Sequence, residues 1–182
     1  MTSIQCLFFS LLRPISTLLC TGIFSGFFCT AVYADSPLSM EDKLKAAYLL
    51  NFTKFIEWPA TTDMTLPSTI RICVDATPEF LQFLSQLVRD RRVGRLKSKV
   101  EVVSHFASSG CELLYLQGKH TPNSLQGGSA IIVTDSDDIL FPDAAIVFYT
   151  ENRKLRFEIN REKINALKVT VSSELLKLAR IK

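Results

Sequence analysis

The chain has 182 residues and carries 21 Lys or Arg side chains against 18 Asp or Glu, which gives a formal charge of +3. This near balance argues against a dedicated nucleic-acid-binding protein, which would carry a clustered basic face. Residues 35–182 have the length of one domain with one hydrophobic core.

The N-terminal segment has the features of a secretory signal peptide. Arg13 is the only charged side chain from Ile4 to Tyr33, and an apolar stretch covers residues 15–29. A small-residue site ends at Ala34, and a polar chain starts at Asp35. This order predicts that residues 1–34 are a signal peptide cleaved after Ala34, and that residues 35–182 are exported to the periplasm. The alternative is an uncleaved membrane anchor.

Hydrophobic periodicity predicts alternating helices and strands in the exported part. Ser39 is expected to cap a helix whose apolar positions recur at helical spacing up to Ile56, before Pro59 closes the segment. Two further helices are predicted to start at Pro78 and after Ser172. Strands are expected over residues 70–74, 100–104, 113–116, 130–134, 145–149, 155–159 and 169–171. The pattern predicts an α/β fold, a single-domain sandwich with a mixed β-sheet flanked by helices.

Only two cysteines, Cys73 and Cys111, remain after removal of the signal peptide. An isolated pair in an exported chain favours a disulfide, and two buried free thiols are the alternative. His105 and His120 lack the spacing of metal ligands, so no metal site is expected.

Other polar motifs give little indication of catalysis. Asp135-Ser136-Asp137-Asp138 offers carboxylates but lacks the spacing of a calcium loop, so a solvated turn is predicted there. Gly127-Gly128 precedes a strand, which favours a turn over a phosphate-binding loop. The basic segment 89–95 is predicted to be a solvated loop, with an acidic partner or anionic lipid as the alternative. The absence of a nucleophile, base or metal constellation argues against an enzyme, and no cofactor is expected.

Two sets of residues are candidates for binding. The first helix carries the aromatic residues Tyr48, Phe52, Phe55 and Trp58, which form either its core face or a partly exposed docking patch. Arg156, Glu158 and Asn160 alternate along one strand and therefore share a face. They form either a small polar site or a ladder of ion pairs and hydrogen bonds.

Six segments are spread over nearly the whole exported part: residues 46–59, 70–74, 111–116, 131–135, 155–160 and 171–179. In this order they resemble the YfiR family of exported bacterial proteins. This resemblance implies a periplasmic regulator that binds and inhibits the periplasmic sensor region of an inner-membrane diguanylate cyclase, and so lowers cyclic-di-GMP and biofilm formation. An outer-membrane lipoprotein can withdraw such a regulator. The resemblance also implies that Cys73 and Cys111 form the core disulfide.

The function predicted from these features is negative regulation through protein–protein interaction, by a chain that we expect to form a homodimer. The strands at residues 145–149 and 155–159 flank the short polar segment 151–154 and are predicted to form a β-hairpin. The docking candidates are the aromatic helix and the exposed parts of this late hairpin. One alternative is a periplasmic small-ligand-binding module in which Trp58, Arg156, Glu158 and Asn160 line a pocket. Another is an accessory of a different membrane sensor, such as a histidine kinase.

Overall fold

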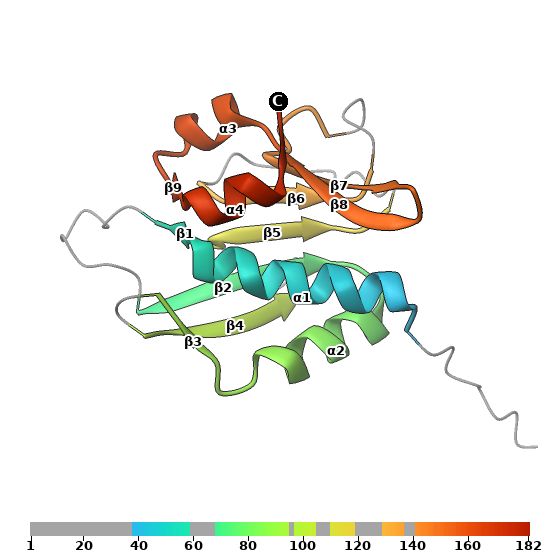
Figure 1. The fold of residues 1–182 in the computed structure, drawn as a ribbon. Coiled ribbons are helices and arrows are strands. Elements are labelled where there is room, and N and C mark those ends of the chain that lie inside the picture. Colours follow the sequence, from blue (N-terminus) through green and yellow to red (C-terminus); the bar gives the residue numbers. More distant parts are fainter. Residues whose placement is uncertain (1–37, 59–67, 95–96, 105–109, 119–128, 137–140) are drawn as a thin grey trace, which may run out of the picture. The chain divides into compact units, whose positions relative to one another are not determined.

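A mixed β-sheet forms the centre of the fold (Figure 1). The computed structural model describes residues 38–58, 68–94, 97–104, 110–118, 129–136 and 141–182. Within these residues the sheet has eight strands in the order β10-β8-β7-β6-β5-β2-β4-β3. The bounds are β2 Thr69–Asp75, β3 Arg92–Val93, β4 Ser98–Ser104, β5 Leu113–Leu116, β6 Ile131–Thr134, β7 Ile146–Glu151, β8 Lys154–Ile159 and β10 Arg180–Ile181.

The strand directions explain why the sheet is mixed. The five central strands, β4, β2, β5, β6 and β7, are parallel to one another. In contrast, β3 is antiparallel to β4, and β8 is antiparallel to β7. β10 pairs with β8 in parallel through Glu158 and Ile159 alone. The predicted mixed α/β sandwich is therefore confirmed.

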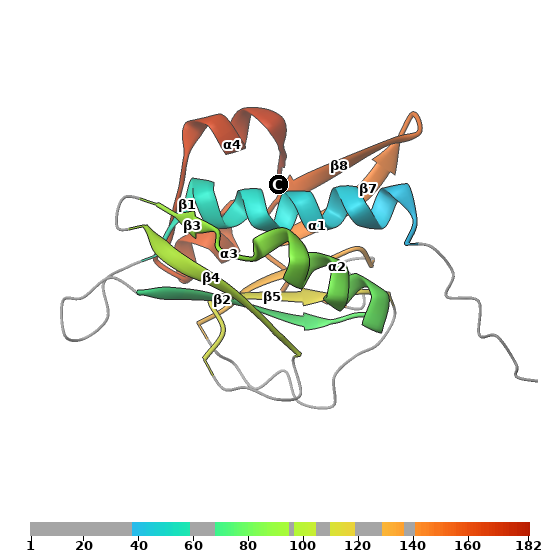
Figure 2. The same cartoon turned by 90° about the horizontal axis from the view of Figure 1, so that it is seen from below.

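The helices share one hydrophobic core with one face of the sheet. They are α1 (Met40–Phe55), α2 (Pro78–Val88), α3 (Arg161–Ala166) and α4 (Ser173–Leu178). Each of them contributes buried residues to the same cluster, among them Phe52, Phe80, Ile164 and Leu175. Figure 2 shows α1 and α2 together over this face. We call it the helix face, and the opposite one the open face.

The open face has a smaller core of its own. Because successive strand residues point to opposite sides, Cys73 faces away from its neighbours Ile72 and Val74. Cys73 packs with Leu114, Leu116, Phe141 and Ala144, and none of these residues belongs to a helix. This second cluster places the disulfide on the open face.

The first helix is shorter than the prediction. It ends at Phe55, because Ile56–Glu57 forms strand β1 and pairs with β9, Thr170–Val171. Ser39 caps its start as predicted, since the Ser39 side chain accepts a hydrogen bond from the Asp42 amide.

Other differences concern short elements and strand ends. The sequence did not predict α3, which has only six residues, nor the two-residue strands β3 and β10.

The hairpin turn between β7 and β8 was predicted, and it consists of Asn152 and Arg153 with φ of 52° and 59°. Two positive φ values in a two-residue turn are typical of a type I′ hairpin.

The predicted signal peptide lies outside the described residues, so its cleavage after Ala34 stays a prediction. Among the residues that the structure describes, no helix is long and apolar enough to cross a membrane.

Candidate functional site

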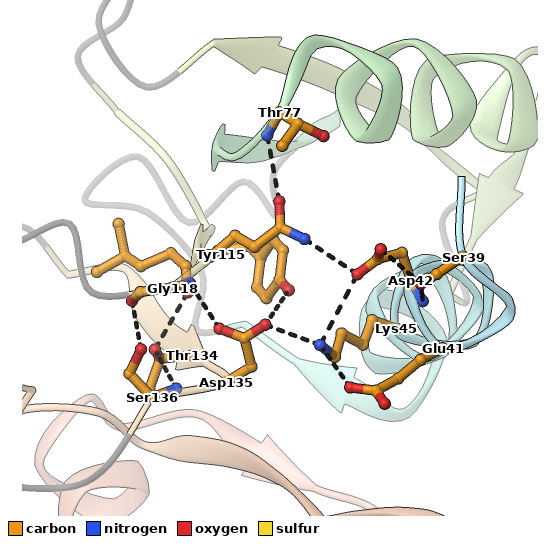
Figure 3. Close-up of polar contacts among 12 residues, drawn as sticks. Ser39, Glu41, Asp42, Lys45, Thr77, Tyr115, Gly118, Thr134, Asp135 and Ser136 are labelled. Atoms are coloured by element: carbon orange, nitrogen blue, oxygen red, sulfur yellow. Dashed lines mark hydrogen bonds and ion pairs between the residues drawn. The ribbon is translucent and has the colours of Figure 1, made fainter. Parts of the chain in front are cut away.

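A polar network lies where three parallel strands end, with Lys45 and Tyr115 buried at its centre, and Figure 3 shows its members. Tyr115 belongs to β5, Asp135 directly follows β6, and Thr77 follows β2 before capping α2. Helix α1 brings Lys45 to the same edge. The carboxyl edge of parallel strands is where α/β folds commonly place functional groups. We call the following set of residues the Lys45 network: Glu41, Asp42, Lys45, Thr77, Tyr115, Gln117, Gly118 and Asp135.

Lys45 is the centre of this network. It is only 7% exposed, and its Nζ atom lies 2.8 Å from Asp135 Oδ2 and 2.9 Å from Glu41 Oε1. Burial alone would lower the pKa of Lys45, but the hydrogen bonds and the negative charges of Asp135 and Glu41 together outweigh burial and raise it. Lys45 is therefore an ammonium ion at neutral pH, which makes it a poor nucleophile or base.

Asp135 is the main partner of Lys45. Its side chain is 12% exposed, its Oδ1 accepts a hydrogen bond from the Gly118 amide at 2.7 Å, and its Oδ2 accepts one from the Tyr115 hydroxyl at 3.3 Å. Burial and the nearby Asp135 charge raise the pKa of Tyr115, so the hydroxyl stays protonated. The prediction of a solvated turn was therefore wrong for Asp135, and Asp137 and Asp138 lie outside the described residues.

A second layer of hydrogen bonds joins α1 to α2. Gln117 donates to Asp42 Oδ1 at 3.0 Å, while its own Oε1 accepts from the Thr77 amide at 3.1 Å. Thr77 in turn accepts from the Phe80 amide and caps α2. The network thus fixes the first turns of both helices to the sheet. Its contacts are structural, since they hold these elements in a defined geometry.

The disulfide is the second feature that fixes the geometry. Cys73 and Cys111 are bonded, with Cα atoms 5.8 Å apart, which confirms the predicted pairing. Beside it, the Arg71 amide donates to Glu112 Oε2 at 2.7 Å, and the Glu112 amide donates to the Arg71 carbonyl at 3.1 Å. The segment that enters β5 is therefore tied to β2 by a covalent bond and by hydrogen bonds.

The aromatic residues of the first helix segment mostly pack inward. Phe52 is fully buried, Trp58 is 9% exposed, and the Trp58 Nε1 donates to the Glu112 carbonyl at 3.3 Å. The Tyr48 ring lies 5.3 Å from the ring of Phe157. Phe55 is half-buried against the same cluster. This arrangement fits the core interpretation, and the exposed apolar side chains of α1 are instead Met40 and Leu44.

Arg156, Glu158 and Asn160 make separate contacts. Arg156 Nε lies 3.2 Å from Glu151 Oε2, and Glu158 lies 3.8 Å from Arg180. The Asn160 side chain accepts from the Lys163 amide and caps α3. These contacts fit the ladder interpretation.

Glu158 and Asn160 also line a shallow cavity of about 230 Å³ on the open face. Its other lining residues are Pro142, Ala144, Ala145, Val147 and Lys182. Trp58 packs in the cluster on the helix face, so the structure does not bring Trp58 together with Glu158 and Asn160 in one pocket.

Sequence reasoning missed Lys45, although a signal was present. Lys45 stands four residues before Leu49 and seven before Phe52, both of which are buried. A lysine on the buried stripe of a helix predicts a buried acidic partner. The identity of that partner, Asp135, is not readable from a separation of 90 positions.

Comparison with known proteins assigns the family. No curated protein matches the chain. The model of the YfiR/HmsC-like family matches residues 42–180. This range includes the main sheet apart from the last residue of β10, the disulfide, and the Lys45 network apart from Glu41. This match agrees with the resemblance read from the sequence. The chain therefore belongs to the YfiR/HmsC-like family.

Proposed function

We propose that this protein is a periplasmic negative regulator that binds the periplasmic sensor region of an inner-membrane diguanylate cyclase and inhibits it. The observation that carries the proposal is the family match over residues 42–180. YfiR/HmsC-like proteins are regulators of cyclic-di-GMP signalling, and the disulfide is consistent with an oxidising compartment.

Inhibition would work by a shift of population in the cyclase. A regulator that binds the silent state of the sensor more tightly than the active state favours the silent state. Reversing a 1:99 equilibrium requires about 5.5 kcal/mol of differential binding. An interface of standard size, about 800 Å² on each partner, is a reasonable source of that energy.

The proposed docking surface combines the exposed start of α1 with the β7–β8 hairpin. Met40 and Leu44 are 71% and 44% exposed, which leaves apolar area for a partner. The Lys45 network supports this assignment because it holds the same helical turns in place before binding. A rigid surface loses less conformational entropy when it binds than a flexible one.

The proposal is tested by deleting the gene and measuring cyclic-di-GMP and biofilm mass. Both are expected to rise, and both are expected to fall again when the wild-type chain is restored. A Leu44→Asp variant that folds normally is expected not to restore the low level, with Lys54→Asp on the same helix as the matched control. Unchanged cyclic-di-GMP in the deletion strain would reject the cyclase as the target, and a neighbouring gene for a histidine kinase would name a different sensor.

Two further partners belong to this proposal. An outer-membrane lipoprotein would compete for the regulator and release the cyclase, and the regulator itself would act as a homodimer. Sedimentation of the purified chain tests the dimer, and added lipoprotein is expected to restore cyclase activity in a reconstituted mixture.

The cavity beside Glu158 and Asn160 favours small-ligand binding as a second candidate function. Thermal unfolding of the isolated protein with candidate metabolites tests it. A rise in melting temperature that Asn160→Asp and Glu158→Gln abolish would support a ligand-binding module.

A further inference from the structure

The β8 strand has an edge that is only partly covered. Residues of an antiparallel pair alternate between those whose backbone groups point to the partner and those whose groups point away. The Asn160 amide donates to Ala145, the residue just before β7, at 2.9 Å. By this alternation Glu158, Arg156 and Lys154 also point their backbone groups towards β7, whereas Ile159, Phe157 and Leu155 point theirs to the outer edge.

Strand β10 covers just one end of this edge. The Lys182 amide donates to the Ile159 carbonyl at 3.0 Å, and the pairing of β10 with β8 stops at Glu158. Among the described residues, no strand pairs with Leu155 on that side. The N–H and C=O of Leu155 are thus available to an added strand. Figure 2 shows the tip of the β7–β8 hairpin extending away from α1.

The side chains around this edge differ between the two faces of the sheet. Arg153 and Lys154 are exposed and form no ion pair with any residue that the structure describes. The neighbouring acid, Glu151, is already bound by Arg156 at 3.2 Å and Arg180 at 2.9 Å. Positive charge is therefore in excess beside Leu155.

The helix face of the same edge is apolar. Leu155 is half-buried there against the main core. Leu178, at the end of α4, is 66% exposed, and Ile181 of β10 is 45% exposed. Because the side chains of a strand alternate between the two faces, an added strand would meet basic groups with every second residue and apolar groups with the others.

We propose that the outer edge of β8 at Leu155 accepts an extended segment of a partner protein in which acidic and apolar residues alternate. The segment adds to the sheet beyond β10, binds the backbone of Leu155, and places its carboxylates against Arg153 and Lys154. Charge complementarity selects this occupant over a second copy of the chain, because a second β8 would bring the same excess of positive charge. This inference rests on the proposed function and specifies how a partner is held.

The test uses the purified exported chain and a short peptide of alternating Glu and Val. A peptide of the same composition with Glu and Val in two separate blocks is the control. Binding is followed by fluorescence anisotropy, and exchange of the Leu155 amide is followed by NMR. We expect the alternating peptide to bind more tightly than the block peptide and to protect the Leu155 amide from exchange.

Two variants separate the contribution of the backbone hydrogen bonds from the contribution of the charged side chains. Leu155→Pro removes the outward N–H and leaves the bonds to β7 in place, so it is expected to weaken binding by about tenfold. Lys154→Glu should weaken binding several-fold, whereas Arg91→Glu, the same reversal near the opposite edge strand β3, should leave it unchanged. If Leu155→Pro fails to fold, Lys154→Glu and the amide exchange decide the question.

The proposal is overturned if the block peptide binds as well as the alternating one, if a folded Leu155→Pro variant binds like the wild type, or if the Leu155 amide gains no protection. None of these measurements includes a cyclase. Failure here would leave the regulatory function standing, and unchanged cyclic-di-GMP after gene deletion would leave the strand-addition site standing.

Discussion

Replacing Lys45 by Met removes the ammonium ion at the centre of the Lys45 network and keeps an unbranched side chain of similar length. Asp135, 12% exposed, would then lose its ionic partner at 2.8 Å. Removing one member of a buried ion pair typically costs about 3–5 kcal/mol. Asp135 keeps its hydrogen bonds from Gly118 and Tyr115, and Glu41 is half-exposed. The expected loss is therefore about 3 kcal/mol, at the low end of that range.

Equilibrium unfolding in urea at neutral pH measures this loss, with Lys43→Met on the same helix as the matched control. For a domain of this size, a loss of about 3 kcal/mol lowers the melting temperature by about 6–12 °C. The double variant Lys45→Met with Asp135→Asn should lose less than the sum of the two single variants, because no buried charge is left without a partner. A Lys45→Met variant as stable as the Lys43→Met control would refute the ion pair as a main support of α1.

Three further outcomes follow from the same structure. The pKa values of Lys45 and Tyr115 are both raised on folding, so both groups stabilise the folded state fully below about pH 10, and this contribution declines as pH rises through the folded pKa values. Urea unfolding at a series of pH values should show the decline. A free energy of unfolding that rises in this range would contradict the prediction. Arg153→Gly should stabilise the hairpin by about 1 kcal/mol, since Arg153 has a φ of 59°; an unchanged urea midpoint would count against the type I′ turn. The variant with Cys73→Ala and Cys111→Ala should lose about 4 kcal/mol of unfolding free energy, because the disulfide joins residues 38 positions apart. A reductant should destabilise the wild type and leave the variant unchanged, which urea unfolding with and without the reductant measures.

The sheet was largely predictable, because its strands are short runs of apolar residues bounded by polar turns. Leu113–Leu116 agrees with its prediction at both ends. Strand order was not predicted, since nothing in the local pattern places β2 between β4 and β5. The helix α3 was missed because Ile164 is its only large apolar residue. The helix α4 has the same length but was predicted, because three leucines follow its capping residue Ser172.

The candidate site was less predictable than the fold. Alternation correctly put Arg156 and Glu158 on one face, but their ion pairs involve Glu151 and Arg180, which come from other strands. The outer edge of β8 also had no local signal. It follows from the two-residue length of β10, which only the folded sheet shows.

The long separation between Lys45 and Asp135 also bears on the order of events in folding. The two residues are 90 positions apart in the chain, and β1 pairs with β9, which is still closer to the C-terminus. Contacts between such distant positions form slowly, because a long loop must close before they contribute any stability. Synthesis starts at the N-terminus, so α1 has none of these partners until residues 135 and 170–171 have also been made. The ion pair between Lys45 and Asp135 and the pairing of β1 with β9 are therefore expected to form late in folding.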